Sequence, residues 1–425
     1  MAINMGFGAA ISGLASSAKS LEVTGNNIAN TSTVGFKSAR AEFSDVLAQS
    51  ISGGLASQRV GMGSNPHAVV QQFQQGNLRR TENPLDMAIG GRGFFMLDDA
   101  GNDRVTYTRN GQFHLEGEPF AGDAAATPEA LNAQRSRLMS SMGLPVLGYA
   151  ATYGADPMGE ISRTGDPVPL TFEPFMPSQA TTQVTMAANF SAGAAEIDAT
   201  VPFDTANSES YHYSRAFNAV DAEGATTRVD LYFRKTGFGA WEMNVVEGGV
   251  PQPTPYALTF DARGQMVSGQ SQALTLGVGA VTLDLSGSTQ YGGAFSLDQL
   301  TQDGYQEGRL TGMSVDRDGT IFGRYSNNEA RRLGQVALAD FQNRNGLQSI
   351  GDNQWLETGA SGTALIGVAQ DQNGLGAINA ASVEDASVDL NQELVNLIIQ
   401  QRNYQANAQA IKTQDQILQT LSGIR

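Results

Sequence analysis

The last segment of the chain, residues 389–425, places apolar side chains three, four or seven positions apart. This spacing puts them on one face of an α-helix. Asp389 is a candidate N-cap for that helix, and Gln392 stands where the second half of a capping box would lie. The pattern therefore predicts a long C-terminal helix. Its apolar seam comprises Leu390, Leu394, Leu397, Ile398, Tyr404, Ile411, Leu418 and Leu421.

The same helix carries a second apolar face. Ile399 and Ile417 are 18 residues apart, or five helical turns, so both point away from the main seam. Ordering about 35 residues costs roughly 35–70 kcal/mol of backbone entropy, and one partner helix buries too little apolar surface to offset this. We therefore expect neighbouring molecules to cover the helix and to be needed for its order in solution. The alternative is an ordinary core helix of a globular domain.

A second seam lies at the other end of the chain, within residues 1–30. Its apolar and small side chains alternate at spacings of three and four: Ile11, Leu14, Ala18, Leu21, Gly25 and Ile28. This pattern predicts a helix from about Asn4 to Ile28. Helices at opposite ends of a chain pair only if the chain folds back on itself. The sequence thus predicts paired, coiled-coil-like terminal helices, with the middle of the chain carried as an insertion.

Between the helices, the pattern changes to the alternation typical of β-strands, interrupted by a proline-rich crossing near residues 167–177. We predict a multidomain α+β protein with two mainly antiparallel β domains as nested insertions. Residues 117–143 break the strand rhythm and suggest no role. The predicted segments between the two helices are a connector (31–71), the first half of a middle β domain (72–177), an outer all-β domain (178–286), the second half of the middle domain (287–345) and a second connector (346–388).

The charge balance excludes several kinds of partner. The net charge is −16, the pI is about 4.6, and lysine is rare. Phosphate binding needs basic clusters, so this composition argues against nucleic acid or an anionic membrane as a partner. The absence of cysteine excludes disulfides, thiolate metal sites and cysteine catalysis. The N-terminus lacks the basic region of a secretory signal, and no apolar run approaches transmembrane length.

No catalytic or metal-binding pattern emerges from the sequence. His67, His114 and His212 lie in different segments without ligand spacing, and there is no Gly-x-Ser-x-Gly motif. The segment from Asp316 to Gly319 has the beginning of a calcium loop but lacks its closing Glu. Its position between two strand-like runs favours a hairpin turn. We therefore predict a protein that is not an enzyme and that binds no cofactor or metal.

A motif follows the first helix. The segment Asn-Asn-Ile-Ala-Asn-Thr-Ser-Thr-Val-Gly-Phe-Lys reads locally as a helix end, with Asn30 as a cap and Gly35 as a turn. As a string, it resembles the motif shared by the rod and hook proteins of the bacterial flagellum. The run from Glu393 to Leu418 is similar to the C-terminal helix of the same family. The resemblance covers about residues 1–115 and 287–425. The residues that carry the motif are Asn26, Asn27, Asn30, Gly35, Phe36 and Lys37.

This resemblance implies a structural subunit of the flagellar hook, a curved, flexible tube that transmits torque from rod to filament and encloses the export channel. It implies that the terminal helices line the tube, that the middle β domain surrounds them, and that residues 178–286 lie outermost. The alternatives are a distal rod subunit and a secreted β-rich adhesive or binding protein.

The implied partners are other copies of the chain, the rod, hook-cap and hook–filament junction proteins, and the flagellar type III export apparatus. That apparatus would deliver the protein to the hook, outside the cell, without a cleaved signal peptide. In this family, a Phe followed four positions later by a hydrophobic residue is recognised by the export gate, and Phe43 and Leu47 fit this pattern. Phe7 and Ile11 have the same spacing, and packing of a connector turn is the other interpretation of Phe43.

Overall fold

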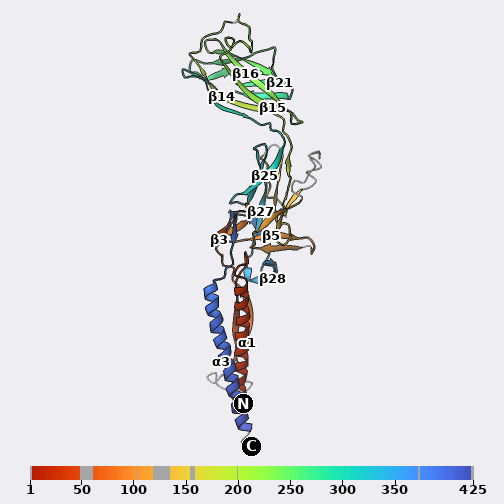
Figure 1. Cartoon of the computed structure of the whole chain (residues 1–425), viewed down its shortest axis with the longest axis vertical. Helices are drawn as coiled ribbons and strands as arrows, with labels where there is room; N and C mark the ends of the chain where they lie inside the picture. Colours follow the sequence, from red (N-terminus) through yellow and green to blue (C-terminus); the bar gives the residue numbers. More distant parts are fainter. Residues whose placement is uncertain are drawn as a thin grey trace.

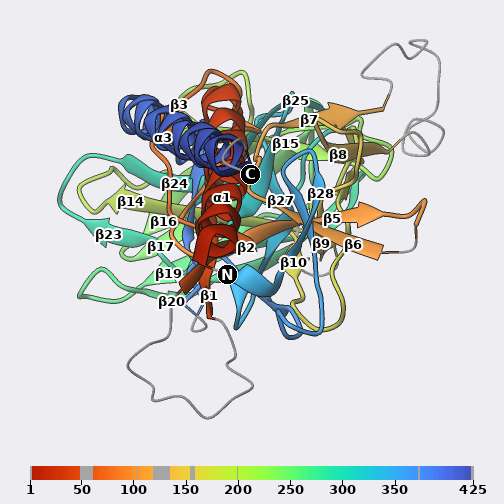
Figure 2. The ribbon, with the colours of Figure 1, turned by 90° about the horizontal axis from the view of Figure 1, so that it is seen from below.

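Three regions follow one another along the longest axis of the molecule (Figure 1): two long helices that carry both chain ends, a middle β region and an outer β sandwich. Helix α1 (Ala2–Ala29) and helix α3 (Leu390–Ser422) lie side by side and run in opposite directions, as Figures 1 and 2 both show. The computed structural model describes residues 2–47, 61–102, 104–117, 135–153, 158–198, 200–371 and 374–422.

The start of α3 is capped as the sequence predicts. The Asp389 carboxylate accepts hydrogen bonds from the backbone N–H groups of Asn391, at 2.9 Å, and Gln392, at 3.2 Å. The reciprocal bond of a capping box, from the Asp389 N–H to the Gln392 side-chain oxygen, is not formed, and the Gln392 amide N–H donates to Asn396 at 3.3 Å. The N-cap prediction is therefore confirmed, and the capping-box prediction is wrong.

The predicted connector 31–71 contains a β-hairpin, not an extended linker with one amphipathic turn. Strands β1 (Ala39–Leu47) and β2 (Gly61–Gln71) pair antiparallel and pack along α1. Ser12 and Ser16 of α1 both hydrogen-bond to Ser64 of β2. At Gly63, with φ +101°, a Cβ would overlap the Ser12 hydroxyl, so only glycine fits. Sequence periodicity missed this hairpin because β2 is glycine-rich and polar and depends on the helix beside it.

The middle region is built around β27 (Ala330–Asp340), which pairs with β26, β5, β9 and β30. Both faces of this strand are buried. Val336 and Leu338 face one apolar cluster, with Phe95 and Leu97 of β5, whereas Ala337 and Ala339 face a second cluster around Trp355.

The other strands of the middle region are β3 (Leu78–Arg80), β4 (Met87–Gly90), β5 (Phe94–Asp99), β6 (Arg104–Thr108), β7 (Phe113–Glu116), β8 (Ser136–Ser140), β9 (Leu147–Thr152), β10 (Glu160–Ile161), β11 (Val168–Pro169), β12 (Thr171–Phe172), β13 (Phe175–Met176), β25 (Gly308–Val315), β26 (Thr320–Tyr325), β28 (Gln348–Gly351), β29 (Gln354–Leu356), β30 (Leu365–Val368), β31 (Ala377–Ala380) and β32 (Ser382–Glu384), with the short 3₁₀ helix η2 (Arg344–Gly346). The predicted hairpin turn at Asp316 to Gly319 is confirmed between β25 and β26.

The second predicted connector, residues 346–388, belongs to the middle region instead. Its strands β29, β30, β31 and β32 pair with β6, β27, β4 and β3, respectively. Three of these partners, β6, β4 and β3, lie far away in the sequence, and the strands are short and rich in small or polar residues. The local alternation of apolar and polar residues therefore gives little indication of these strands. The C-terminal segment is thus anchored in the β region up to the last residues before α3.

The outer region is a sandwich of a five-stranded and a six-stranded sheet. Its core includes Phe190, Phe233 and Trp241. The pairs β14–β22 and β14–β23 are parallel, and the other pairs described in this sandwich are antiparallel. The strands are β14 (Gln183–Ser191), β15 (Tyr213–Val220), β16 (Thr226–Gly237), β17 (Ala240–Glu247), β18 (Val250–Pro251), β19 (Tyr256–Phe260), β20 (Met266–Ser268), β21 (Ser271–Leu276), β22 (Gly279–Asp284), β23 (Thr289–Tyr291) and β24 (Ser296–Gln302).

The predicted end of the outer domain at residue 286 is too early, because β23 and β24 both pair with β14. A register shift between Ala187 and Ala188 interrupts the β14–β24 ladder, and β24 is mostly polar, which hides its period of two. Two chain crossings join the sandwich to the middle region. Gln179 and Tyr305 bind each other through both backbone N–H groups there, at 2.9 and 3.1 Å.

Candidate functional site: the terminal helices and their anchor

The two terminal helices meet through amides and small side chains. The Asn27 amide of α1 donates to Glu393 of α3 at 3.2 Å, and further along the pair the Asn407 amide donates to the Ser17 hydroxyl at 3.4 Å. Asn407 also lies over Gly13, where an added Cβ would stand only 3.0 Å from it. These polar contacts join the two helices at separate points along their length.

Helix α3 leaves most of its apolar side chains exposed beside these contacts. Most of the predicted seam is exposed, and so is the second stripe with Ile399 and Ile417, at 48% and 45%. Leu397 and Ile411 are half-buried, and the side chain of Leu421 lies outside those described. The contact with α1 therefore leaves most of the predicted seam uncovered, and the coiled-coil-like pairing of the terminal helices stays a prediction. The exposed seam residues, between 37% and 49%, are Leu390, Leu394, Ile398, Tyr404 and Leu418.

Helix α1 shows the same offset. Its buried positions are Ser16, Ser17, Val23, Thr24 and Asn27, which face the hairpin and α3. In contrast, the predicted seam of α1 is rotated away from this face and is only partly covered: Ile11 is 45% exposed, and Leu14, Leu21 and Ile28 are half-buried. A single chain thus leaves apolar stripes open on both helices.

The motif after α1 folds into a tight junction. The Asn27 side chain bonds both the N–H and the C=O of Ala39, each at 2.9 Å, and thereby fixes the start of β1. Asn30 donates through its amide to the Asn26 carbonyl at the helix end, at 3.0 Å. Gly35 has φ +73°, and a Cβ there would lie 2.6 Å from the Asn110 nitrogen. The glycine and asparagine positions of the motif therefore serve close backbone packing.

Two links tie this motif to the C-terminal segment. The Gly35 N–H donates to the Glu384 carbonyl at 2.7 Å, and the Ser387 N–H donates to the Phe36 carbonyl at 3.1 Å. The C-terminal partner residues, Glu384 and Ser387, lie in β32 and just after it, immediately before α3. The two chain ends are therefore joined at the base of the helices as well as along them.

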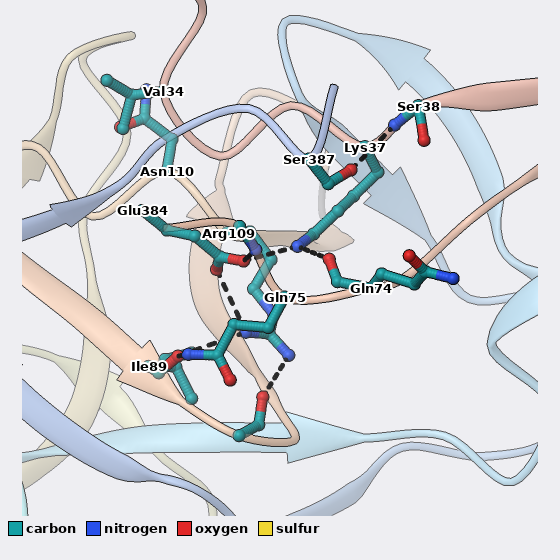
Figure 3. Close-up of polar contacts among 12 residues, drawn as sticks. Val34, Lys37, Ser38, Gln74, Gln75, Ile89, Arg109, Asn110, Glu384 and Ser387 are labelled. Carbon is teal, nitrogen blue, oxygen red and sulfur yellow. Dashed lines mark hydrogen bonds and ion pairs between the residues drawn. The ribbon is translucent and has the colours of Figure 1, made fainter. Parts of the chain in front are cut away.

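The last residue of the motif, Lys37, enters a buried ionic cluster (Figure 3). Its ammonium lies 2.6 Å from Glu384 Oε1 and donates to the Gln74 carbonyl, also at 2.6 Å. Arg109 lies on the other side of the carboxylate, with Nη1 3.2 Å from Glu384 Oε2 and Nη2 2.7 Å from the Gly91 carbonyl. All three charged side chains are at most 3% exposed.

Burial shapes the electrostatics of this cluster. Desolvation lowers the pKa of Lys37 and of Arg109, and the carboxylate of Glu384 opposes the shift in both. Two cations share one anion, and the carbonyls of Gln74 and Gly91 accept further hydrogen bonds, whereas the buried Arg109 Nε has no hydrogen-bond partner among the described residues. A buried pair is strongly destabilised when one partner is removed, so this cluster fixes the segments that carry its members. Those segments are the motif, the middle sheet and the strand before α3.

Sequence reasoning found Lys37 as part of the motif but not its partners. Arg109 lies within a run, Tyr107 to Phe113, that also matches the family pattern, yet nothing local marks its side chain as buried. Glu384 is an isolated charge in a three-residue strand. Lysine is rare in this chain, and its presence inside the motif is a signal that could have marked this position as buried and paired.

The candidate export residues lie on the hairpin. Phe43 is in β1, is 40% exposed and lines a hollow of about 550 Å³ between the hairpin and the two helices. Leu47 ends β1, and its side chain lies outside those described. The segment is thus a strand rather than a loose connector turn.

The comparisons with known proteins define the class first. The family model of the flagella basal body rod protein matches residues 7–37, that of the flagellar basal body protein FlaE D2 domain matches 185–305, and that of the flagellar basal body rod FlgEFG protein C-terminal region matches 380–424. These segments are α1 with its motif, the outer sandwich and α3 with the strand before it. The matches indicate a structural component of the flagellum.

Whole-chain relatives identify the family. The flagellar hook protein FlgE of Escherichia coli K12 is 37% identical over 434 residues, which cover 99% of this chain and 100% of that protein. That of Borreliella burgdorferi is 29% identical over 459 residues, which cover 97% of each. The crystal structure of the Helicobacter pylori flagellar hook protein FlgE2 shares the fold, with a TM-score of 0.52 and 14% identity, over 72% of this chain and 100% of that one. The chain belongs to the flagellar hook protein family, whose members are structural proteins and not enzymes.

The family places this chain in the flagellum. None of the described helices is both long and apolar enough to cross a membrane.

Proposed function

We propose that copies of this chain polymerise into a curved, flexible tube that joins rod to filament, transmits torque and encloses the export channel. The observation that carries this proposal is the pair of open apolar stripes on α3, next to a polar contact with α1. An exposed apolar surface of this extent on a helix marks an interaction site. Neighbouring copies are the partners that a tube supplies on every side.

The order of the three regions along the molecule supports a layered wall (Figure 1). The terminal helices, paired as a coiled-coil-like bundle with those of other copies, would form the inner wall around the channel. The middle β region would form the next layer, and the outer sandwich the surface. Since the predicted connectors are folded strands, bending is assigned to the contacts between outer sandwiches and to the crossings near Gln179 and Tyr305. Contacts of modest area can break and form again at a low cost in free energy.

Electron microscopy of the purified protein after salt-induced assembly tests this function. Curved tubes are expected. Straight tubes would instead favour a distal rod subunit, and protein that stays monomeric at every concentration would favour a secreted binding or adhesive protein.

The remaining partners are part of the same proposal: the rod, hook-cap and hook–filament junction proteins at the ends of the tube, and the type III export apparatus before assembly. Export without a cleaved signal peptide requires recognition of an internal element, and Phe43 is the candidate because its ring is accessible on β1. Phe43→Ala is expected to leave the protein expressed but retained in the cell. Val69→Ala, on the exposed face of the neighbouring strand, is the matched control and should be exported normally. Normal export of Phe43→Ala would remove this residue from the proposal.

A further inference from the structure

One aromatic side chain on the outer sandwich is almost fully exposed and makes no aromatic contact within the described part of the chain. Phe238 is 88% exposed at the tip of the β16–β17 hairpin. The tip is held in place, because the Phe260 N–H donates to the Gly239 carbonyl at 2.7 Å and Gly239, at φ +69°, has no room for a Cβ beside the Phe260 carbonyl. The turn therefore presents the Phe238 ring to solvent, and the exposure of this apolar side chain is unfavourable for a protein that remains alone.

A hollow of about 590 Å³ lies toward the opposite end of the same sandwich. Its apolar lining includes Val250, which is 70% exposed, and Pro251, Pro253 and Tyr256. Strand β17 connects the two features, because it begins at Ala240, next to the Phe238 turn, and ends at Glu247, in the wall of the hollow. At about 3.3 Å per residue, the strand separates them by roughly 23 Å.

Charge is complementary between the two ends. Arg263 lies on the exposed β19–β20 turn next to the Phe238 turn, and it forms no ion pair within the described part of the chain. Glu247 in the hollow accepts a hydrogen bond from the Gly277 N–H at 2.6 Å but likewise has no ion-pair partner among the described residues. Because each copy carries a net charge of −16, an approach that brings a cation onto a carboxylate is favoured over other approaches.

We propose that the outer sandwiches of successive copies dock head to tail, with the Phe238 turn of one copy inserted into the hollow lined by Val250, Pro251 and Tyr256 of the next. The two surfaces lie on different ends of one domain, so the contact is heterologous. A contact of this kind does not close in a dimer but continues from copy to copy, as a helical tube requires. This inference rests on the proposed function and adds the partner surface of the outer layer.

Cysteine cross-linking tests the contact directly, because the natural chain has no cysteine. The double variant Phe238→Cys, Val250→Cys is expected to give a ladder of covalent multimers when assembled tubes are mildly oxidised, and to stay monomeric in dilute solution. A control double variant, Phe238→Cys with Val168→Cys on the middle region, should give no ladder. Dimers formed by Phe238→Cys alone would mean that two turns meet each other, and they would overturn the proposal.

Assembly thermodynamics provides a second test. Phe238→Ala should raise the critical concentration for tube formation about tenfold or more, since a buried aromatic ring is lost at each contact. Val168→Ala, which removes a 48% exposed side chain from the middle region, should change it less than twofold. If the natural chain forms tubes but no ladder appears and Phe238→Ala assembles equally well, the docking inference is wrong and the proposed function stands. If the natural chain forms no tubes, the proposed function itself fails.

Discussion

In the outer sandwich, apolar side chains from two sheets face one another, and Phe190, Phe233 and Trp241 are at most 1% exposed. In the terminal helices, the arrangement is reversed. Amides and hydroxyls lie between α1 and α3, and Leu394 and Ile398 are 43% and 49% exposed. The sandwich completes its core within one chain, whereas the helices leave theirs to be completed by other molecules.

This difference has an energetic meaning. Burial of apolar area is the main favourable term that offsets the entropy of ordering a chain, and hydrogen bonds contribute only about 1 kcal/mol each. The amide contacts between α1 and α3 therefore stabilise the helix pair only weakly. They leave the apolar faces of the helices available to other molecules. The two ends of the molecule should respond differently to mutation, proteolysis and assembly.

The largest effect is expected for a charge placed on the open stripe of α3. Leu394→Asp should abolish tube formation at all accessible concentrations, because every copy would then bury an unpaired carboxylate. The β regions should keep their thermal unfolding transition, since Leu394 contributes to neither core. Sedimentation and circular dichroism measure the two properties separately.

Asn403→Asp is the matched control for this variant. It adds the same charge to an exposed position of α3 that is two and a half helical turns from Leu394 and therefore on the opposite side of the helix. We expect a smaller effect on assembly. If Leu394→Asp polymerises as well as Asn403→Asp, the open stripe is not the assembly surface.

Limited proteolysis compares the two ends in the unassembled protein. We expect rapid loss of about the first 70 and last 40 residues from monomers, because helices with open apolar faces are marginal in isolation. Trypsin should cut at the exposed Arg402 and Lys412 of α3 in monomers and much more slowly in tubes. Arg228 is equally accessible but lies within β16 of the sandwich, and it should resist in both states. Uniform resistance along the monomer would show that the helices are already stable without neighbours.

The predictability of these regions from sequence follows the same division. Helix α3 was predicted at 389–425 and spans Leu390 to Ser422, because its period and its cap at Asp389 are local features. The long alternating strands β14 and β16 were found for the same reason. However, which face of a helix lies inside a single chain is not a local property. The apolar period of α3 predicted a surface for neighbouring molecules but not which of its residues α1 would cover: Leu397 and Ile411 are half-buried, whereas Leu394 and Ile398 are exposed.

Elements that depend on distant partners were missed. Strand β32 has three residues and pairs with β3 some 300 positions earlier, so no window of sequence contains its signal. Glu384 in that strand is buried only because Lys37 and Arg109 reach it from two other segments. The hairpin β1–β2 was likewise hidden, since its stability comes from contacts with α1.

The buried cluster that joins the two ends should be the most sensitive part of the middle region. Glu384→Gln leaves the cations of Lys37 and Arg109 without an anion and should reduce the free energy of unfolding by about 3–5 kcal/mol. Denaturant unfolding measures this loss. The adjacent Asp385→Asn breaks only the exposed ion pair with Arg79, at 3.0 Å, and should cost less than about 1 kcal/mol. Equal losses for the two variants would contradict the role of the cluster as the anchor of the helices.

The smallest effect is expected at the N-cap of α3. Its size should depend on whether the protein is monomeric or assembled into tubes. Asp389→Ala removes the acceptor for the N–H groups of Asn391 and Gln392 and should destabilise α3 by about 1 kcal/mol. In monomers whose helices are already frayed, this change should leave circular dichroism and thermal unfolding almost unaltered. In tubes, where α3 is ordered, the same change should raise the critical concentration about fivefold. Asp389→Asn retains a capping oxygen and should restore assembly. A cap mutation that instead lowered the melting temperature of the monomer by several degrees would show that α3 is firmly folded before any neighbour covers it.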